Sequence, residues 1–125
     1  MRVHTKRVYA PAAPADGTRV LIMRLWPRGI RKARVDVWLK ELGPVVPLLR
    51  AFLDGGLGWA AYRRRYLTGL ARPEAQEALG AVRALARRGP VTLLCGCADE
   101  TRCHRSLLRD YLLDLAAWRG RRRSF

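Results

Sequence analysis

Short apolar runs in this sequence predict buried strands. Val91–Cys95 is a compact apolar run, and Thr18–Leu25 is mostly apolar. Runs of this kind are typical of strands that are buried on both faces of a sheet. Val3–Ala10 alternates loosely between apolar and polar residues and contains Val8 and Tyr9, so it is predicted to form a first strand.

Residues 30–42 do not favour a single kind of element. Val35, Val37 and Leu39 alternate as they would in a strand, with polar or aromatic residues between them. Gly43 and Pro44 end the segment, whichever structure it adopts.

Apolar residues at helical spacing predict helices in the middle and at the end of the chain. A short helix is expected over Val45–Leu53, and a second has an apolar, aromatic face between residues 59 and 70. A third begins near Pro73, which suits the first turn of a helix, and ends at Gly89–Pro90. A final helix is expected from about residue 102 to residue 118.

The order of these elements predicts an α/β fold. A helix, a buried strand, a tight loop and another helix follow one another toward the end of the chain, and such crossovers imply parallel strand pairing. We therefore expect a single compact domain over residues 1–118, with helices packed on a small, mostly parallel sheet. Residues 119–125 are expected to form a basic C-terminal tail.

The composition supports a globular domain and adds an unusual charge. The chain has 125 residues, of which 50% are hydrophobic, enough to bury a core. Its 25 Lys and Arg residues outnumber 10 acidic residues, which gives a net charge of +15. Such a charge favours polyanionic partners, although an Ala- and Arg-rich composition is also what a GC-rich genome encodes.

Several classes of protein are excluded by the same survey. No apolar run approaches the roughly 20 residues that cross a bilayer, and residues 1–25 lack the pattern of a signal peptide. Three cysteines, two of them one residue apart, make a poor disulfide framework. The expectation is a cytoplasmic protein with reduced thiols and no membrane partner.

Residues with reactive or ligand-binding side chains gather in the loop after the last predicted strand. Ligands of open α/β sheets bind beyond the carboxyl ends of the strands. If Thr101 caps the final helix, Cys103 and His104 lie in its first turn, where free N–H groups and the helix dipole favour an anion or a thiolate. Cys103 is therefore the candidate nucleophile or redox thiol, with His104 assisting and Arg105 beside it.

Simpler interpretations of these residues stay open. Cys95, at the end of a buried strand, is also what a small core residue would look like. Cys95, Cys97, Cys103 and His104 offer the ligand atoms that zinc prefers, but their spacing lacks the paired C-x-x-C pattern of many zinc sites. Neither a metal nor another cofactor is therefore predicted.

A second cluster follows the second predicted strand. Arg24, Trp26 and Arg28 place an indole between two guanidinium groups, and such a group can bind a phosphate and stack on a base or sugar. The structural alternative is that Trp26 fills a gap in the core, while the arginines bond to carbonyls or carboxylates.

The motifs in this order resemble the YeaO-like family of bacterial proteins, also called domain of unknown function 488. The resemblance extends over about residues 3–115, and its most specific stretch is Arg24–Gly29, with the sequence RLWPRG. Trp38–Leu42, Val91–Cys95 and Cys103–Arg105 are further matches. The resemblance implies an α/β fold and a cytoplasmic single-domain protein, and it implies no particular activity.

Three positions depart from the family pattern. Cys97 stands where the family tends to have a Glu, and Val45 stands where a Ser usually follows the proline. No His occurs near Phe52–Asp54, where the family commonly has one. An acid–base role for residue 97 is therefore not implied.

Two functions are expected from these observations, besides a purely structural or partner-binding role. In the first, a phosphate- or carboxylate-bearing small molecule binds between the Arg24–Gly29 segment and the Cys95–Arg105 loop, held by Arg24, Arg28 and Arg105 and packed by Trp26. In the second, exposed arginines bind nucleic acid without sequence specificity; they are Arg63, Arg64, Arg65, Arg87, Arg88 and the arginines of residues 119–123. The sequence contains no recognised nucleic-acid-binding motif, and it does not decide whether the protein is an enzyme.

Overall fold

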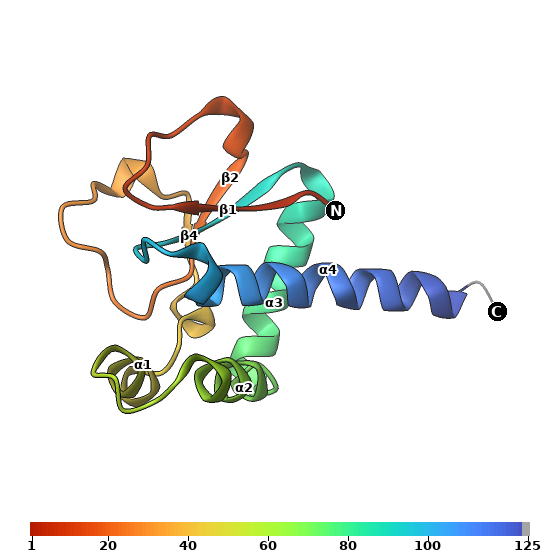
Figure 1. Ribbon diagram of the computed structural model, residues 1–125. Helices are drawn as coiled ribbons and strands as arrows, with labels where there is room; N and C mark the ends of the chain where they lie inside the picture. The colour runs from red at the N-terminus through yellow and green to blue at the C-terminus, as the bar shows by residue number, and fades with distance from the viewer. Residues whose placement is uncertain (124–125) are drawn as a thin grey trace.

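The protein is a two-layer α/β structure in which helices cover one face of a parallel sheet (Figure 1). The computed structural model describes the chain trace over residues 1–123 and the side chains of residues 1–114. The strands are β1 (Val3–Arg7), β2 (Thr18–Leu21), β3 (Val37–Trp38) and β4 (Val91–Cys95); the helices are α1 (Val46–Leu53), α2 (Trp59–Gly69), α3 (Pro73–Arg88) and α4 (His104–Arg123). Together they confirm the predicted α/β fold.

The sheet has the order β1-β4-β2-β3, and every pair of neighbours is parallel. The last strand of the chain therefore lies between the first two. All five residues of β4 are buried, which confirms the prediction from its continuous apolar run. β3 pairs with β2 only at Val37 and Trp38, so the ambiguous segment contributes a short edge strand.

The two faces of the sheet are covered differently. Side chains of β1, β2 and β4 pack with those of α2, α3 and α4 in the larger core, which includes Val20, Leu93 and Leu108. On the opposite face Leu21 and Leu94 pack with Val8 and with side chains from the segment after β2. Successive residues of a strand point to opposite faces, so β2 and β4 must be apolar on both sides.

Some predicted boundaries shift. β2 ends at Leu21 instead of residue 25, because its pairing with β3 and its pairing with β4 both end there; beyond it, Leu25 is 65% exposed. The predicted basic tail, residues 119–125, involves side chains outside the described part, so the domain boundary at residue 118 stays a prediction. Among the described residues, no helix combines the length and the apolar character needed to span a bilayer.

Candidate functional site at the carboxyl end of the central strand

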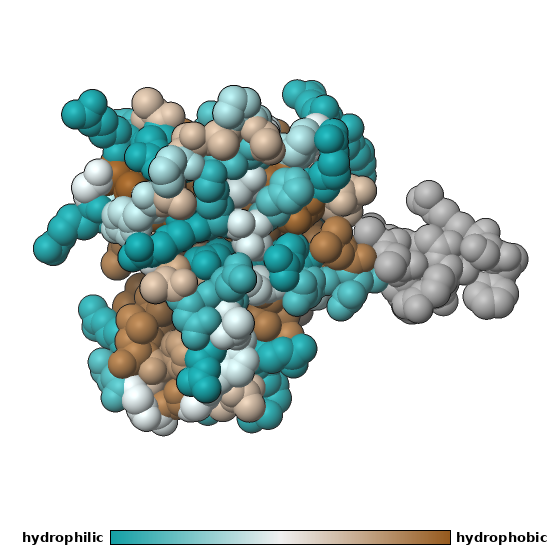
Figure 2. Space-filling model, turned by 45° about the horizontal axis from the view of Figure 1, so that its top comes forward, coloured by the Kyte–Doolittle hydropathy of each residue, from teal (hydrophilic) through white to brown (hydrophobic). Residues whose placement is uncertain are grey.

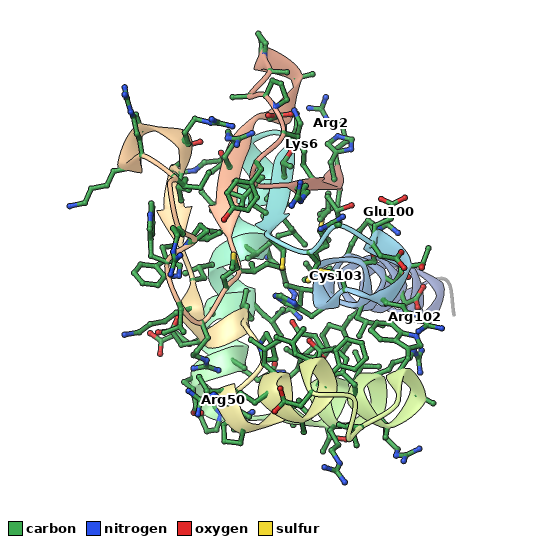
Figure 3. The ribbon with its side chains drawn as sticks, turned by 60° about the vertical axis from the view of Figure 1, so that its left-hand side comes forward. Arg2, Lys6, Arg50, Glu100, Arg102 and Cys103 are labelled. Atoms are coloured by element: carbon green, nitrogen blue, oxygen red, sulfur yellow. The ribbon has the colours of Figure 1, made fainter. Side chains whose placement is uncertain are left out.

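The loop after β4 begins at the carboxyl edge of the sheet and leads into α4 (Figure 3). Asp99, not Thr101, caps the turn: its Oδ1 accepts hydrogen bonds from the N–H and the hydroxyl of Thr101, at 2.9 and 2.6 Å. This cap begins a short 3₁₀ turn over Glu100–Arg102. Cys103 has an extended backbone, and α4 starts at His104. Thr101 does not cap the final helix, because the cap at Asp99 begins a separate turn; of the two residues expected in the first turn of α4, His104 lies there and Cys103 does not.

His104 is oriented by a distant backbone carbonyl. Its Nε2 donates a hydrogen bond of 2.5 Å to the carbonyl oxygen of Ile22, just beyond β2. Because a carbonyl only accepts, Nε2 carries a proton, and Nδ1 is the ring nitrogen that faces the cysteines. Nδ1 lies 3.8 Å from the Cys95 sulfur and 4.0 Å from the Cys103 sulfur.

Two of the three cysteines and His104 lie in the protein interior. Cys95, Cys103 and His104 are 2%, 1% and 3% exposed. Cys97 is half-buried, and its sulfur lies 3.6 Å from that of Cys95. In Figure 3 Cys103 lies on the inner side of the loop, whereas Glu100 and Arg102 point outward. Cys97 is thus the thiol of this cluster nearest to solvent.

The three thiols differ in the direction in which their pKa values are shifted. Hydrogen bonds to Cys95 and Cys97, together with burial, raise the pKa of Cys103 far above its usual range. Hydrogen bonds from Cys103 and Cys95 lower the pKa of Cys97 well below its usual range. A bond with Cys103 lowers the pKa of Cys95, but its bond with Cys97 and its burial outweigh this and raise it to about 11. The direction at Cys103 is opposite to that of an activated thiol; a catalytic role for Cys103 and His104 stays a prediction.

Two tyrosines of α2 close the inner side of the cluster. The Tyr66 ring packs edge-on against His104 at 5.4 Å between centroids, and its hydroxyl donates to the Leu42 carbonyl at 2.7 Å. Burial raises the pKa of Tyr62, and the nearby sulfurs of Cys103, Cys97 and Cys95 raise it further. Both tyrosines belong to the aromatic face predicted between residues 59 and 70, and helical spacing carries no signal of the cysteines beside them.

Arg105 and Arg24 bring positive charge to the same region. Arg105 is 3% exposed and donates from Nη1 to the Cys97 carbonyl at 2.7 Å and to the Cys103 sulfur at 3.8 Å. Arg24 donates from Nη2 to the Gly43 carbonyl at 2.9 Å, and its charge acts on Tyr66. Gly43 permits this close approach, because a Cβ there would lie 2.4 Å from the Arg24 backbone nitrogen.

The contacts of Trp26 and Arg28 are with residues outside the cysteine cluster. The Trp26 indole donates to the Ile30 carbonyl at 2.8 Å and packs edge-on against Trp38 at 5.4 Å. Arg28 is exposed. An open groove of about 820 Å³ beside Trp26 is lined by Trp26, Ile30, Arg31, Lys32, Val35, Asp36 and Trp38, with no residue of the 95–105 loop. The contacts of Trp26 match the structural alternative, while its predicted ligand role stays a prediction.

The arginines named as nucleic-acid contacts lie on α2 and α3. Arg63, Arg64, Arg65, Arg87 and Arg88 are all exposed; the side chains of residues 119–123 lie outside the described part. Figure 2 shows hydrophilic residues spread over the visible face, with hydrophobic patches between them, and not gathered in one stripe. Non-specific nucleic-acid binding stays a prediction.

Comparison with known proteins identifies the family. A model described as "Active DUF488-N3 subclade" matches residues 3–116. The chain is similar to Uncharacterized protein YeaO of Escherichia coli (strain K12), with 39% identity over 117 residues that cover 92% of this chain and 100% of that protein. It is also similar to Uncharacterized protein Rv3073c of Mycobacterium tuberculosis (strain ATCC 25618 / H37Rv), with 34% identity over 113 residues that cover 89% of this chain and 93% of that protein.

No solved protein structure matches the chain significantly. The family match covers nearly all of the sequence, and it includes both the Arg24–Gly29 motif and the loop after β4. The resemblance seen in the sequence motifs is therefore confirmed: this chain belongs to the YeaO-like DUF488 family.

Proposed function

We propose that this chain binds an anionic ligand, bearing a phosphate or carboxylate group, beside the loop that follows β4. The observation that carries the proposal is the state of Arg105. Its guanidinium group is charged at any physiological pH and is 3% exposed. None of the ion pairs among the described side chains includes it, and its Nε has no hydrogen-bond partner there. This guanidinium group helps to lower the pKa of the Cys97 sulfur, and a bound anion would add a second counter-charge for Arg105 and Arg24.

Arg24 supports the same proposal independently. Its Nη2 is occupied by the Gly43 carbonyl, but its Nε is buried without a hydrogen-bond partner among the described residues. Guanidinium groups bind carboxylates and phosphates through paired N–H donors. Arg24 and Arg105 thus both offer unused donors around His104 and the tyrosines of α2.

The place in the fold favours a ligand as well. The loop lies beyond the carboxyl end of a central parallel strand, where α/β proteins bind their ligands. The matching family model is described as an active subclade, which agrees with a site that does more than stabilise the fold. Arg28 and Trp26, proposed from sequence as further contacts, would reach such a ligand only from the neighbouring segment.

Arg24→Gln tests the proposal. We expect the purified protein to bind inorganic phosphate or acetate, measured by isothermal titration calorimetry at constant ionic strength. Arg24→Gln should weaken that affinity at least tenfold, because a hydrogen bond to a charged group contributes about 1.5–3 kcal/mol. Arg105→Lys, which keeps the charge but removes the planar donors, should weaken it as well. Arg64→Gln, on the exposed face of α2, is the matched control and should bind like the wild type.

Two results would overturn the proposal. One is an Arg64→Gln variant that loses as much affinity as Arg24→Gln, because binding would then follow net charge alone. The other is no heat of binding for either anion, together with salt-dependent binding of a random DNA duplex, which would favour the nucleic-acid alternative.

A further inference from the structure

We infer that Cys95, Cys97, Cys103 and His104 form a binding site for a zinc ion, a function separate from anion binding. Three thiolates and one imidazole are a ligand set found in structural zinc sites. The sequence spacing argued against such a site, because it lacks the paired C-x-x-C pattern. The fold removes that objection by bringing the end of β4 and the start of α4 together.

The distances between ligand atoms suit a tetrahedral ion. The Sγ atoms of Cys95 and Cys103 and Nδ1 of His104 all lie within 4.8 Å of one another, a set of three that does not include the Cys97 sulfur. Two sulfurs that are each about 2.3 Å from a tetrahedral zinc lie about 3.8 Å apart, and a sulfur and a ring nitrogen lie slightly closer. The contacts of 3.6 Å (Cys95–Cys97), 3.8 Å (Cys95–His104) and 4.0 Å (Cys103–His104) are close to these separations.

The surroundings of His104 are those of a metal ligand. A histidine that binds a metal through one nitrogen usually donates its other N–H to a carbonyl or carboxylate, which fixes the tautomer. The Ile22 carbonyl has this role at Nε2, so that the lone pair of Nδ1 faces the sulfurs. Arg105 donates to the Cys103 sulfur and to the Cys97 carbonyl, which would support two further ligands from outside the coordination sphere.

The burial of the cluster points to a closed, structural site. Three of the four proposed ligands are at most 3% exposed; Cys97 is half-buried, its sulfur lies 3.6 Å from that of Cys95, and it is the proposed fourth ligand. Zinc held by three thiolates and a neutral imidazole would carry a net charge of −1. Together with the charges of Arg105 and Arg24, the region would keep a net charge of +1, which still favours an anionic ligand.

Metal binding by the whole, reduced protein tests the inference. The protein is stripped with a chelator, kept with a non-thiol reductant, and titrated with zinc against a chromophoric chelator. We expect one zinc ion per chain and a higher melting temperature in its presence. Cobalt(II) should give the charge-transfer absorption of thiolate ligands, which phosphate or nucleic acid would not produce.

Single substitutions show whether these residues hold the ion. Cys97→Ser, at a half-buried position, should fold and bind zinc at least tenfold more weakly, because loss of an outer-shell partner alone costs 10- to 100-fold. His104→Gln should do the same. His4→Gln is the matched control, since His4 is exposed and is the other of the two histidines.

The inference is overturned if the folded, reduced wild type binds zinc no more tightly than Cys97→Ser, or if its cobalt form lacks the thiolate absorption. Equal loss of affinity in His4→Gln would also overturn it. Each of these results leaves the phosphate titration of the Arg24→Gln variant unaffected, so failure of this site and failure of the anion site are separable.

Discussion

Asp16→Asn is expected to lower the free energy of unfolding at pH 7 by about 3 kcal/mol, the lower end of the cost of removing one partner from a buried ion pair. Asp16 is 8% exposed and Arg19 is 6% exposed, and their side chains form an ion pair. Lys6 adds a second ion pair at 3.1 Å, and the Ala13 N–H donates to the carboxylate at 3.0 Å. The substitution would leave Arg19 charged in the interior without its counter-ion.

Chemical unfolding in urea measures this effect. Asp110→Asn is the matched control, because Asp110 pairs with Arg109 at an exposed position, where its side chain is 61% exposed. Exposed ion pairs contribute about 0–1 kcal/mol. Equal losses in the two variants would show that the burial of the Asp16 pair does not matter.

The same pair predicts a dependence of stability on pH. Burial raises the pKa of Asp16, but the Ala13 N–H and then Lys6 and Arg19 outweigh it, and the pKa is lowered from 3.8. A lowered pKa in the folded state means that the carboxylate stabilises the protein above its ordinary pKa and loses this effect as the pH falls through the folded value. The difference between wild type and Asp16→Asn should therefore shrink below about pH 4. A difference that stays constant down to pH 2 would contradict this.

Leu93→Ala is expected to lower the free energy of unfolding by about 3 kcal/mol, within the range of about 2–5 kcal/mol for such core truncations. Leu93 is 0% exposed in β4, between Thr5 of β1 and Val20 of β2. Its side chain is part of the core that α3 and α4 share with the sheet, so alanine leaves a cavity that neighbours on both sides cannot fill.

Thermal or urea unfolding of Leu93→Ala should be compared with that of Leu53→Ala. Leu53 is 68% exposed at the end of α1, and exposed substitutions usually change stability by no more than about 0.5 kcal/mol. A loss below 1 kcal/mol in Leu93→Ala would show that β4 is not the centre of the core.

The sequence predicts which residues of the loop belong to the candidate site, but not how they are arranged. The loop after β4, with Cys95, Cys103, His104 and Arg105, was identified because buried strands and helix starts leave local signals. The differences in pKa among the thiols could not be predicted, since they depend on which sulfur receives hydrogen bonds from the other two. The pairing of His104 with Ile22 joins residues that are 82 positions apart, and no local pattern reports such a contact.

Periodicity along the chain decided the class of each long element, the parallel character of the sheet and the place of the loop after β4. Spacings of two and 3.6 residues are local properties, so they can be read without the fold. The strand order and the two-residue β3 were decided only by the pairing of segments that are distant in the sequence. The sheet order β1-β4-β2-β3 places the end of β4 beside the end of β2. This long-range neighbourhood lets His104 bond to the Ile22 carbonyl and buries it together with Cys95 and Cys103.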